Sequence, residues 1–355
     1  MADYTRRTLA GFTGAKTNVA LIGARGQELG ASSSSALPPN PSQCNSTSLS
    51  AIRPNQQGDG SGRQGSSVKP LYHHFVRQAK KLNPRYISLI IPARWFVSGR
   101  GLDSFRSEML NDERIRILHD YPNSRDCFPH VEIAGGVCYF LWDRDHRGLC
   151  KVITHMDNGI AAEMERPLLE EGCETFIRFN PAVSILKKIK DTREPSLSQV
   201  LNAGRYFGFH TKVDWIDDVA GTLQTADGQS SFAVSSEKSK DKSIKVYIAH
   251  GTCWISKNDI VRNRQDVDKY KVIIPRTGSP TGSIIGKPII SEPALCSSNS
   301  YVVIIPQNNT LESAQIIISY LQTKFVRFLV SLRTTTQDKA PKAYSFVPLQ
   351  DFGES

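Results

Sequence analysis

The chain has 355 residues, which is enough for two domains. Of these residues 39% are hydrophobic and 22% charged, so the chain can form apolar cores and is too apolar to be wholly disordered. Lys and Arg outnumber Asp and Glu by 44 to 34, and the formal net charge of +10 favours a polyanionic partner. The seven cysteines are scattered without a C-x-x-C pair, and no apolar run approaches a membrane span, so we expect a cytoplasmic protein without a disulfide scaffold, zinc ribbon or membrane partner.

Residues 1–67 differ in composition from the rest. They contain the serine run Ser32–Ser35, the segment Leu37–Pro41, which holds three prolines, and a stretch rich in Gly and Ser over 58–67. No apolar period of 2 or 3.6 residues is sustained there. This pattern predicts a low-complexity, disordered tail and linker.

Regular apolar patterns begin at Val68. We predict a helix over 68–82 with Leu71, Phe75, Val76, Ala79 and Leu82 inward, and a helix over 103–110 capped by Asp103. Buried or alternating runs predict strands at 86–92, 115–120, 137–142 and 150–153. This order is typical of the second half of a doubly wound α/β domain, which we place at 68–155.

A second region, 156–355, mixes both kinds of element. Helical patterns cover 182–189 and 313–332, and apolar runs predict strands at 245–249, 271–275 and 301–305. The polar stretch 225–242 is typical of a loop. The fold class predicted for the whole chain is therefore α/β.

Generic catalytic motifs are not found. The sequence has no G-x-G-x-x-G after a strand, no P-loop, no H-E-x-x-H and no G-x-S-x-G. His73 and His74 are adjacent, which is poor geometry for one metal, and we predict no metal site. Asp143 and Asp145 are either paired carboxylates facing one side of a strand end or, as we favour, solvated turn charges balanced by Arg144 and Arg147.

Several longer motifs carry a resemblance. They are Gln56–Gly60, Pro70–Val76, Leu89–Phe96, Gly99–Arg106, Asp120–Asn123, Phe128–Pro129 and Gly135–Phe140, followed by Tyr206–Thr211, Lys269–Val272, Gly286–Ile290, Arg327–Arg333, Thr336–Asp338 and Tyr344–Pro348. In this order they resemble adenine-specific DNA methyltransferases of restriction–modification systems, over about 56–352. The resemblance implies the C-terminal half of a Rossmann-like methyltransferase sheet followed by a mixed α/β target-recognition domain.

The family's chemistry implies roles for a few residues. The adenine leaves the base stack, an Asn-Pro-Pro-Tyr motif binds its N6 group, and S-adenosylmethionine supplies the methyl group. Phe128 matches the aromatic residue placed against the flipped base, with a core phenylalanine as the alternative. Pro70, Leu71 and Tyr72 match the segment beside the cofactor pocket, with helix capping and packing as the alternative.

Basic and polar residues near predicted loops are candidate DNA contacts. Arg94, Arg100 and Arg106 flank a loop at the carboxyl edge of the sheet, where open α/β folds bind ligands. Further candidates in the second region are Arg205, His210, Lys212, Arg276, Thr277 and Lys342. Each of these side chains either contacts DNA or is only a solvated loop residue.

The sequence departs from the family where the catalytic motif belongs. Ile52–Asn55 stands directly before Gln56 in place of Asn-Pro-Pro-Tyr, and residues 1–55 contain no credible glycine-rich cofactor loop. Codons exist for Thr47–Pro54 that spell Phe-Ile-Val-Gly-Asn-Pro-Pro in another reading frame. We therefore hypothesise that residues 1–55 are translated out of frame, with coincidence as the alternative, and sequencing of the locus decides between them.

The resulting functional expectation is methylation of adenine N6 in one duplex DNA sequence, by a chain that is truncated and inactive alone. The alternative is a non-catalytic DNA-binding or specificity module, and a third reading is a decayed product with no stable fold. Double-stranded DNA is the expected partner, with a companion endonuclease or a complementary methyltransferase fragment as a second one.

Overall fold

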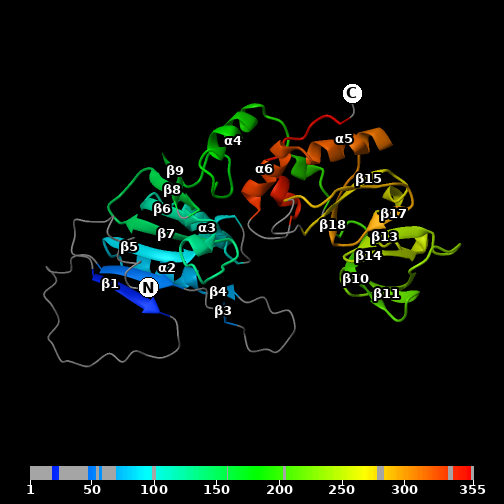
Figure 1. The fold of residues 1–355 in the computed structure, drawn as a ribbon, viewed down its shortest axis with the longest axis horizontal. Coiled ribbons are helices and arrows are strands. Elements are labelled where there is room, and N and C mark those ends of the chain that lie inside the picture. The colour runs from blue at the N-terminus through cyan, green and yellow to red at the C-terminus, as the bar shows by residue number, and fades with distance from the viewer. Residues whose placement is uncertain are drawn as a thin grey trace. The chain divides into compact units, whose positions relative to one another are not determined.

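The computed structural model describes residues 69–97, 101–157, 159–202, 205–277, 284–334 and 339–352, together with the backbones of three short strands before residue 58. The chain divides into two compact units, Met1–Pro181 and Ala182–Ser355 (Figure 1). Both contain helices and sheets, so the predicted α/β class is confirmed. No helix in the described ranges is long and apolar enough to cross a membrane.

The first unit is built around a five-stranded sheet. Its described elements are β1 (Asn18–Gly23), β2 (Thr47–Ile52), β3 (Gln56–Gln57), β4 (Lys69–Pro70), α2 (Tyr72–Lys81), β5 (Tyr86–Pro92), α3 (Asp103–Leu110), β6 (Ile115–Tyr121), β7 (Val137–Asp143), β8 (Cys150–Met156) and β9 (Gly159–Arg166). The strand order is β5-β7-β6-β8-β9. β7 runs antiparallel between β5 and β6, so β5 and β6 point the same way, and β8 is parallel to β6.

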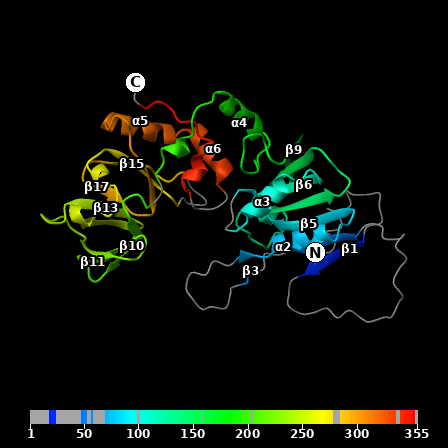
Figure 2. The ribbon, with the colours of Figure 1, turned by 180° about the vertical axis from the view of Figure 1, so that it is seen from behind.

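Two further strands lie beside this sheet. β1 and β2 pair in parallel, and β2 lies next to β5; both views show β1 on that side of the sheet (Figures 1 and 2). The disorder predicted for 1–67 lies mostly outside the described residues, but β1, β2 and β3 fall within it. β1 and β2 have six residues each and β3 has two, and our prediction contains no strand at these positions.

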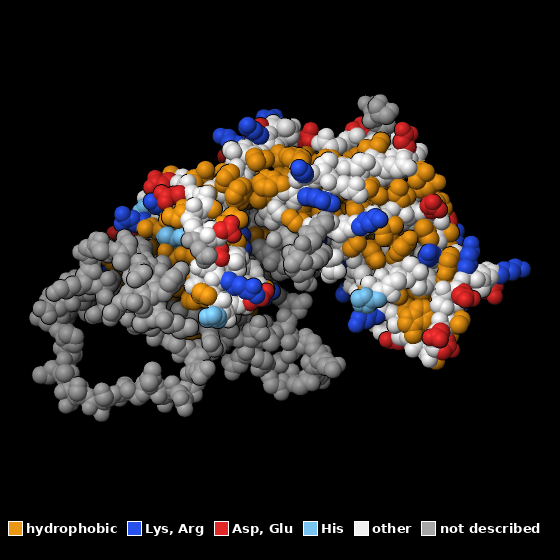
Figure 3. All heavy atoms as spheres, viewed as in Figure 1, with side chains coloured by type: hydrophobic (Ala, Val, Ile, Leu, Met, Phe, Trp, Pro, Cys, Tyr) orange, Lys and Arg blue, Asp and Glu red, His pale blue; other side chains and the backbone are white. Residues whose placement is uncertain are grey.

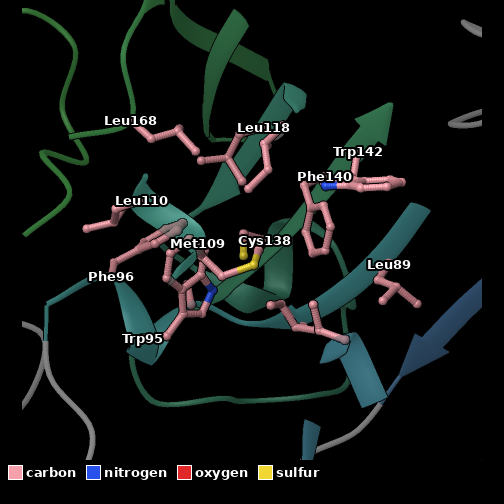
Figure 4. Packing of buried hydrophobic residues seen from close by; sticks show 14 of the residues in the cluster. Leu89, Trp95, Phe96, Met109, Leu110, Leu118, Cys138, Phe140, Trp142 and Leu168 are labelled. Atoms are coloured by element: carbon pink, nitrogen blue, oxygen red, sulfur yellow. The ribbon is translucent and has the colours of Figure 1, made fainter. Parts of the chain in front are cut away.

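Both helices of the first unit pack on the same core. Val76 and Ala79 of α2 and Phe105 and Met109 of α3 are fully or almost fully buried there. In Figure 4, Trp95, Met109 and Cys138 lie together at one end of the cluster, and Phe140 and Trp142 at the other. The core therefore joins the two helices to β5, β6 and β7.

Three details differ from the sequence prediction. Phe75 and Leu82 of the first helical pattern are 52% and 72% exposed, because the buried side of α2 is set by Tyr72, Val76 and Ala79. Asp103 is the first residue of α3 rather than its cap, and its carboxylate accepts a hydrogen bond from Arg106.

The first unit also extends past the boundary that the sequence suggests. We placed that boundary at 155/156, whereas the two units divide after Pro181. The intervening residues belong to the first unit, because β9 pairs with β8 and the Phe176 amide donates to the Phe96 carbonyl. Leu168 and Phe176 join the core.

The second unit has two sheets and three α-helices within its described part. Its elements are α4 (Ala182–Asp191), β10 (Phe209–Trp215), β11 (Ala220–Thr225), β12 (Ser231–Ser235), β13 (Ile244–Ile248), β14 (Gly251–Ile255), β15 (Lys271–Pro275), β16 (Ile289–Ser291), β17 (Leu295–Ser297), β18 (Tyr301–Ile304), α5 (Leu311–Leu321) and α6 (Lys324–Arg333). The sheets have the orders β10-β11-β12-β14-β13-β17 and β16-β15-β18. One core joins them, with Val246 and Cys253 from the larger sheet and Ile273 and Val303 from the smaller.

Two predictions fail in this unit. The supposed loop 225–242 contains β12, because Asp227 and Gly228 make a tight turn in which the Asp227 carboxylate accepts from the Gln229 amide. The helix predicted over 313–332 is two helices, α5 and α6. Thr323 starts the second one, since its hydroxyl accepts a hydrogen bond from the Val326 amide.

Candidate functional site

Strand ends of the first sheet meet at one edge. In the register of the sheet, Val137 at the start of β7 lies between Pro92 at the end of β5 and Tyr121 at the end of β6. The carboxyl ends of two like-directed strands therefore share this edge. Open α/β sheets bind their ligands at such an edge.

A close approach of backbone shapes the edge. Gly136 has φ +78°, and a Cβ there would lie 2.1 Å from the Tyr121 carbonyl oxygen. The Ala93 amide donates to the Gly136 carbonyl at 3.0 Å. Only glycine fits this position, which holds the start of β7 against the ends of β5 and β6.

A buried ion pair lies beside the same edge. Arg178 donates from Nε and Nη2 to the Asp120 carboxylate at 2.8 and 2.5 Å and from Nη1 to the Gly135 carbonyl at 2.7 Å. Asp120 is fully buried. Burial would lower the pKa of the Arg178 guanidinium, but the Asp120 carboxylate raises it, and the net pKa of Arg178 is raised. Sequence reasoning missed this pair, since its members are 58 positions apart.

Of the three residues that the resemblance places beside the cofactor pocket, Tyr72 lies in the core. Its hydroxyl is buried, and within the described ranges neither it nor the Trp95 indole N–H has a hydrogen-bond partner. Burial, and then the nearby Cys138 thiol, raises the pKa of Tyr72. Pro70 pairs with Gln56 in the β3–β4 ladder, and Leu71 is the N-cap of α2. Tyr72 therefore packs in the core and Leu71 starts the helix without a side-chain cap, while a cofactor contact stays a prediction.

Phe128 follows the carboxyl end of β6. Its amide donates to the Ser124 carbonyl at 2.7 Å, and its ring packs against the buried cluster of Tyr121, Val137 and Tyr139. The side chain is half-buried. It therefore contributes to a small core and also keeps part of its surface open at the edge, as base stacking requires.

The three arginines of the first unit differ. Arg94 is exposed, and Arg100 lies outside the described residues. The Arg106 side chain is 12% exposed, and its guanidinium donates to the Trp95 carbonyl at 2.9 Å and to Asp103 at 2.8 Å. Arg106 thus ties α3 to the turn after β5, whereas Arg94 has its charge in solvent.

Candidate DNA contacts of the second unit form two groups. Arg205, His210 and Lys212 are exposed at and just before β10. Arg276, Thr277 and Lys342 come from neighbouring segments, because the Lys339 amide donates to the Arg276 carbonyl at 2.7 Å. Thr277 and Lys342 are exposed, while the Arg276 guanidinium donates to the Asn299 side chain at 3.0 Å. On the face seen in Figure 3, basic side chains of this unit are scattered rather than gathered in one patch.

The carboxylate pair after β7 is structural. Asp143 is buried and accepts from the Asp145 amide at 3.1 Å, and Asp145 pairs with Arg85 and Arg144. Arginines therefore balance both carboxylates, but Asp143 is buried and pairs with Arg116, and Arg147 donates to backbone carbonyls instead, so the expected solvation of Asp143 and role of Arg147 are wrong. The described ranges hold no group of three or more His, Cys, Asp or Glu arranged for a metal.

A pocket for S-adenosylmethionine is only partly supplied by the described residues. Phe128 offers aromatic surface, but Tyr72 is buried in the core, Asp120 is paired with Arg178 and Asp103 with Arg106. Asp126, just after the end of β6, accepts a hydrogen bond from the Asn123 side chain at 2.9 Å. These residues do not make a complete cofactor pocket.

Comparison with known proteins gives partial matches. Residues 40–128 match the family model Eco57I restriction-modification methylase. A segment of 102 residues is 36% identical to an uncharacterized adenine-specific methylase of Mycoplasma pneumoniae, and this alignment covers 28% of the chain and 24% of that protein. The chain therefore matches about a quarter of the length of this curated relative.

Solved structures give weaker likenesses. The type IIG restriction endonuclease BpuSI has 11% identity and a TM-score of 0.37, covering 87% of this chain and 47% of that one. The type IIL restriction-modification enzyme MmeI, solved in complex with DNA, has 10% identity and a TM-score of 0.38, covering 80% and 41%. By the family model alone, residues 40–128, which contain β2, β5, α2, α3, β6 and Phe128, are similar in sequence to an Eco57I restriction-modification methylase.

Proposed function

We propose that this chain acts in a restriction–modification system as an adenine-specific DNA methylase, transferring a methyl group from S-adenosylmethionine to adenine N6 in one duplex sequence. The match of residues 40–128 to the methylase family model carries the proposal. The matched segment includes the ends of β5 and β6, where the edge described above is formed.

Within this proposal the described residues have limited roles. Phe128 stacks on the flipped adenine through the exposed part of its ring. Gly136 and the Asp120–Arg178 pair position the strand ends around it. The cofactor supplies the methyl group, and additional groups are needed to complete its pocket.

One observation favours a second function, a non-catalytic DNA-binding or specificity module. The sequence contains no Asn-Pro-Pro-Tyr, and Ile52–Asn55 stands where the resemblance places it. In this reading the chain binds DNA itself, with a companion endonuclease or methyltransferase fragment as its partner. The reading-frame hypothesis for residues 1–55 stays a prediction. The family match begins at residue 40, so it includes residues that this hypothesis places out of frame.

Radiolabelled methyl transfer separates the two functions. The full chain is incubated with labelled S-adenosylmethionine and duplex DNA of mixed sequence, and the DNA is digested to nucleosides. Label in N6-methyladenine supports the methylase, and Phe128→Ala is then expected to lower kcat/KM about 10- to 100-fold through lost stacking. DNA binding without transfer supports the module and contradicts the methylase.

A further inference from the structure

On one face of the larger sheet of the second unit, the side chains around Trp254 are only half-buried. The inner face of this sheet packs on β15 and β18 through the shared core. The outer face presents the alternate residues, because Lys245 on β13 lies opposite Trp254 on β14, and Ser235 on β12 also faces Trp254. Lys245, Tyr247 and Trp254 are half-buried, whereas Val246 and Cys253 between them are fully buried.

Two lysines are held over aromatic rings on this outer face. The Lys238 ammonium lies 5.6 Å and the Lys245 ammonium 5.8 Å from the centre of the Trp254 ring. Lys245 is also 5.8 Å from the centre of the Tyr247 ring. These are cation–π distances, and such a contact attracts an ammonium group to the ring without neutralising its charge.

The lysines of residues 237–245, which include Lys238 and Lys245, are not balanced by ion pairs. Residues 237–245 contain four lysines and two carboxylates. Within the described part of the chain, none of these lysines forms an ion pair, whereas Lys257 and Lys269 of the same unit pair with Asp268 and Asp266. Ammonium groups that are gathered on one sheet face and form no ion pair are suited to bind an anionic polymer.

We propose that the outer face of the six-stranded sheet is a phosphate-binding surface for duplex DNA, with Lys238 and Lys245 as the phosphate contacts and Trp254 as their positioning residue. This inference rests on the proposed function, which makes DNA the substrate. Duplex DNA is favoured over a single strand because the lysines occupy the Trp254 ring, whereas single-strand binders use aromatic rings open to base stacking.

The test is the salt dependence of DNA binding by the full chain, measured by fluorescence anisotropy with a labelled duplex of mixed sequence. The slope of log K against log salt is negative, and each lost phosphate contact makes it less steep by about 0.9. K238Q/K245Q is therefore expected to make the slope less steep by about 1.8. K257Q/K269Q removes the same charge from paired lysines of this unit. Its slope is expected to equal that of the unchanged chain.

A second variant tests the positioning role. W254L keeps both lysines, so the salt slope should stay the same while the affinity for duplex DNA falls about two- to fivefold. W254F should restore the affinity, because a phenyl ring also binds a cation. Thermal melts of all variants check that the second unit stays folded. A loss of affinity in W254L that W254F leaves unrestored contradicts the positioning role.

The outcomes separate the inference from the proposed function. If the unchanged chain does not bind duplex DNA, both fail. If it binds and K238Q/K245Q keeps its slope, the assigned surface is wrong and the proposed function stands. Tighter binding of single-stranded DNA, lost in W254L, would show that the ring is a stacking platform and that the assigned partner is wrong.

Discussion

Gly136 is the residue on which the candidate edge depends most directly. A methyl group there would overlap the carbonyl of Tyr121, and its φ of +78° already disfavours an L-residue. We expect Gly136→Ala to lower the free energy of unfolding by about 3 kcal/mol or more, measured by urea denaturation.

Gly101 is a matched control for this variant, since it has the same φ of +78° but nothing within 4 Å of an added Cβ. Gly101→Ala should cost only the backbone strain, about 1 kcal/mol. Equal losses in the two variants would mean that steric overlap at the edge is unimportant.

A histidine pair on the opposite side of β6 from the main core predicts a pH dependence. His119 Nδ1 lies 2.8 Å from His155 Nε2, and the rings stack on Tyr139 and Tyr121 with centres 4.1 Å apart. Burial, then the neighbouring His155 and Lys151, lowers the pKa of His119 to about 3. In the unfolded chain this pKa is about 6.5.

Because the folded pKa is the lower one, the unfolded state binds the proton first as the pH falls. The stabilisation is full above about pH 6.5 and is lost progressively toward pH 3. We expect this histidine to account for a loss of about 1–2 kcal/mol between pH 7 and pH 5, measured by denaturation at both values.

His119→Phe keeps an aromatic ring against Tyr139 and should flatten this dependence. His130→Gln, which removes an exposed imidazole, serves as the control and should leave the dependence unchanged. An unaltered pH dependence in His119→Phe would contradict the assignment.

At the scale of elements, the break between α5 and α6 depends on a single cap. The Thr323 hydroxyl accepts from the Val326 amide at 3.2 Å, and α6 buries Val326, Leu329 and Val330. Thr323→Ala should cost about 1 kcal/mol of unfolding free energy, while Thr323→Ser keeps the hydroxyl and should cost much less. If denaturation gives the two variants the same stability, the cap does not stabilise α6.

At the scale of the whole molecule, the chain has two units with separate cores. Separate cores predict two unfolding transitions in scanning calorimetry. Gly136→Ala should lower the midpoint of one transition and Thr323→Ala that of the other. A single transition that both variants shift together would show that the two cores unfold as one cooperative unit.

The sequence by itself determined the elements whose apolar pattern is long or nearly continuous. The strands β5, β6, β7 and β15 and the helix α3 lie close to their predicted ranges, because runs such as Val137–Phe140 are buried on both faces and leave little choice of structure. The family motifs likewise lie in local sequence, and the match of residues 40–128 agrees with those of them that lie before residue 129.

Tertiary structure alone decided the features that depend on distant partners. The strand β12, with its single buried valine, is held by pairing with β11 and β14, and Phe75 became exposed when packing selected the other side of α2. The Asp120–Arg178 pair and the lysine–tryptophan surface join residues that periodicity cannot relate. Which side chains are buried and which charges pair depends on contacts between elements. The residue pattern within one element does not predict those contacts.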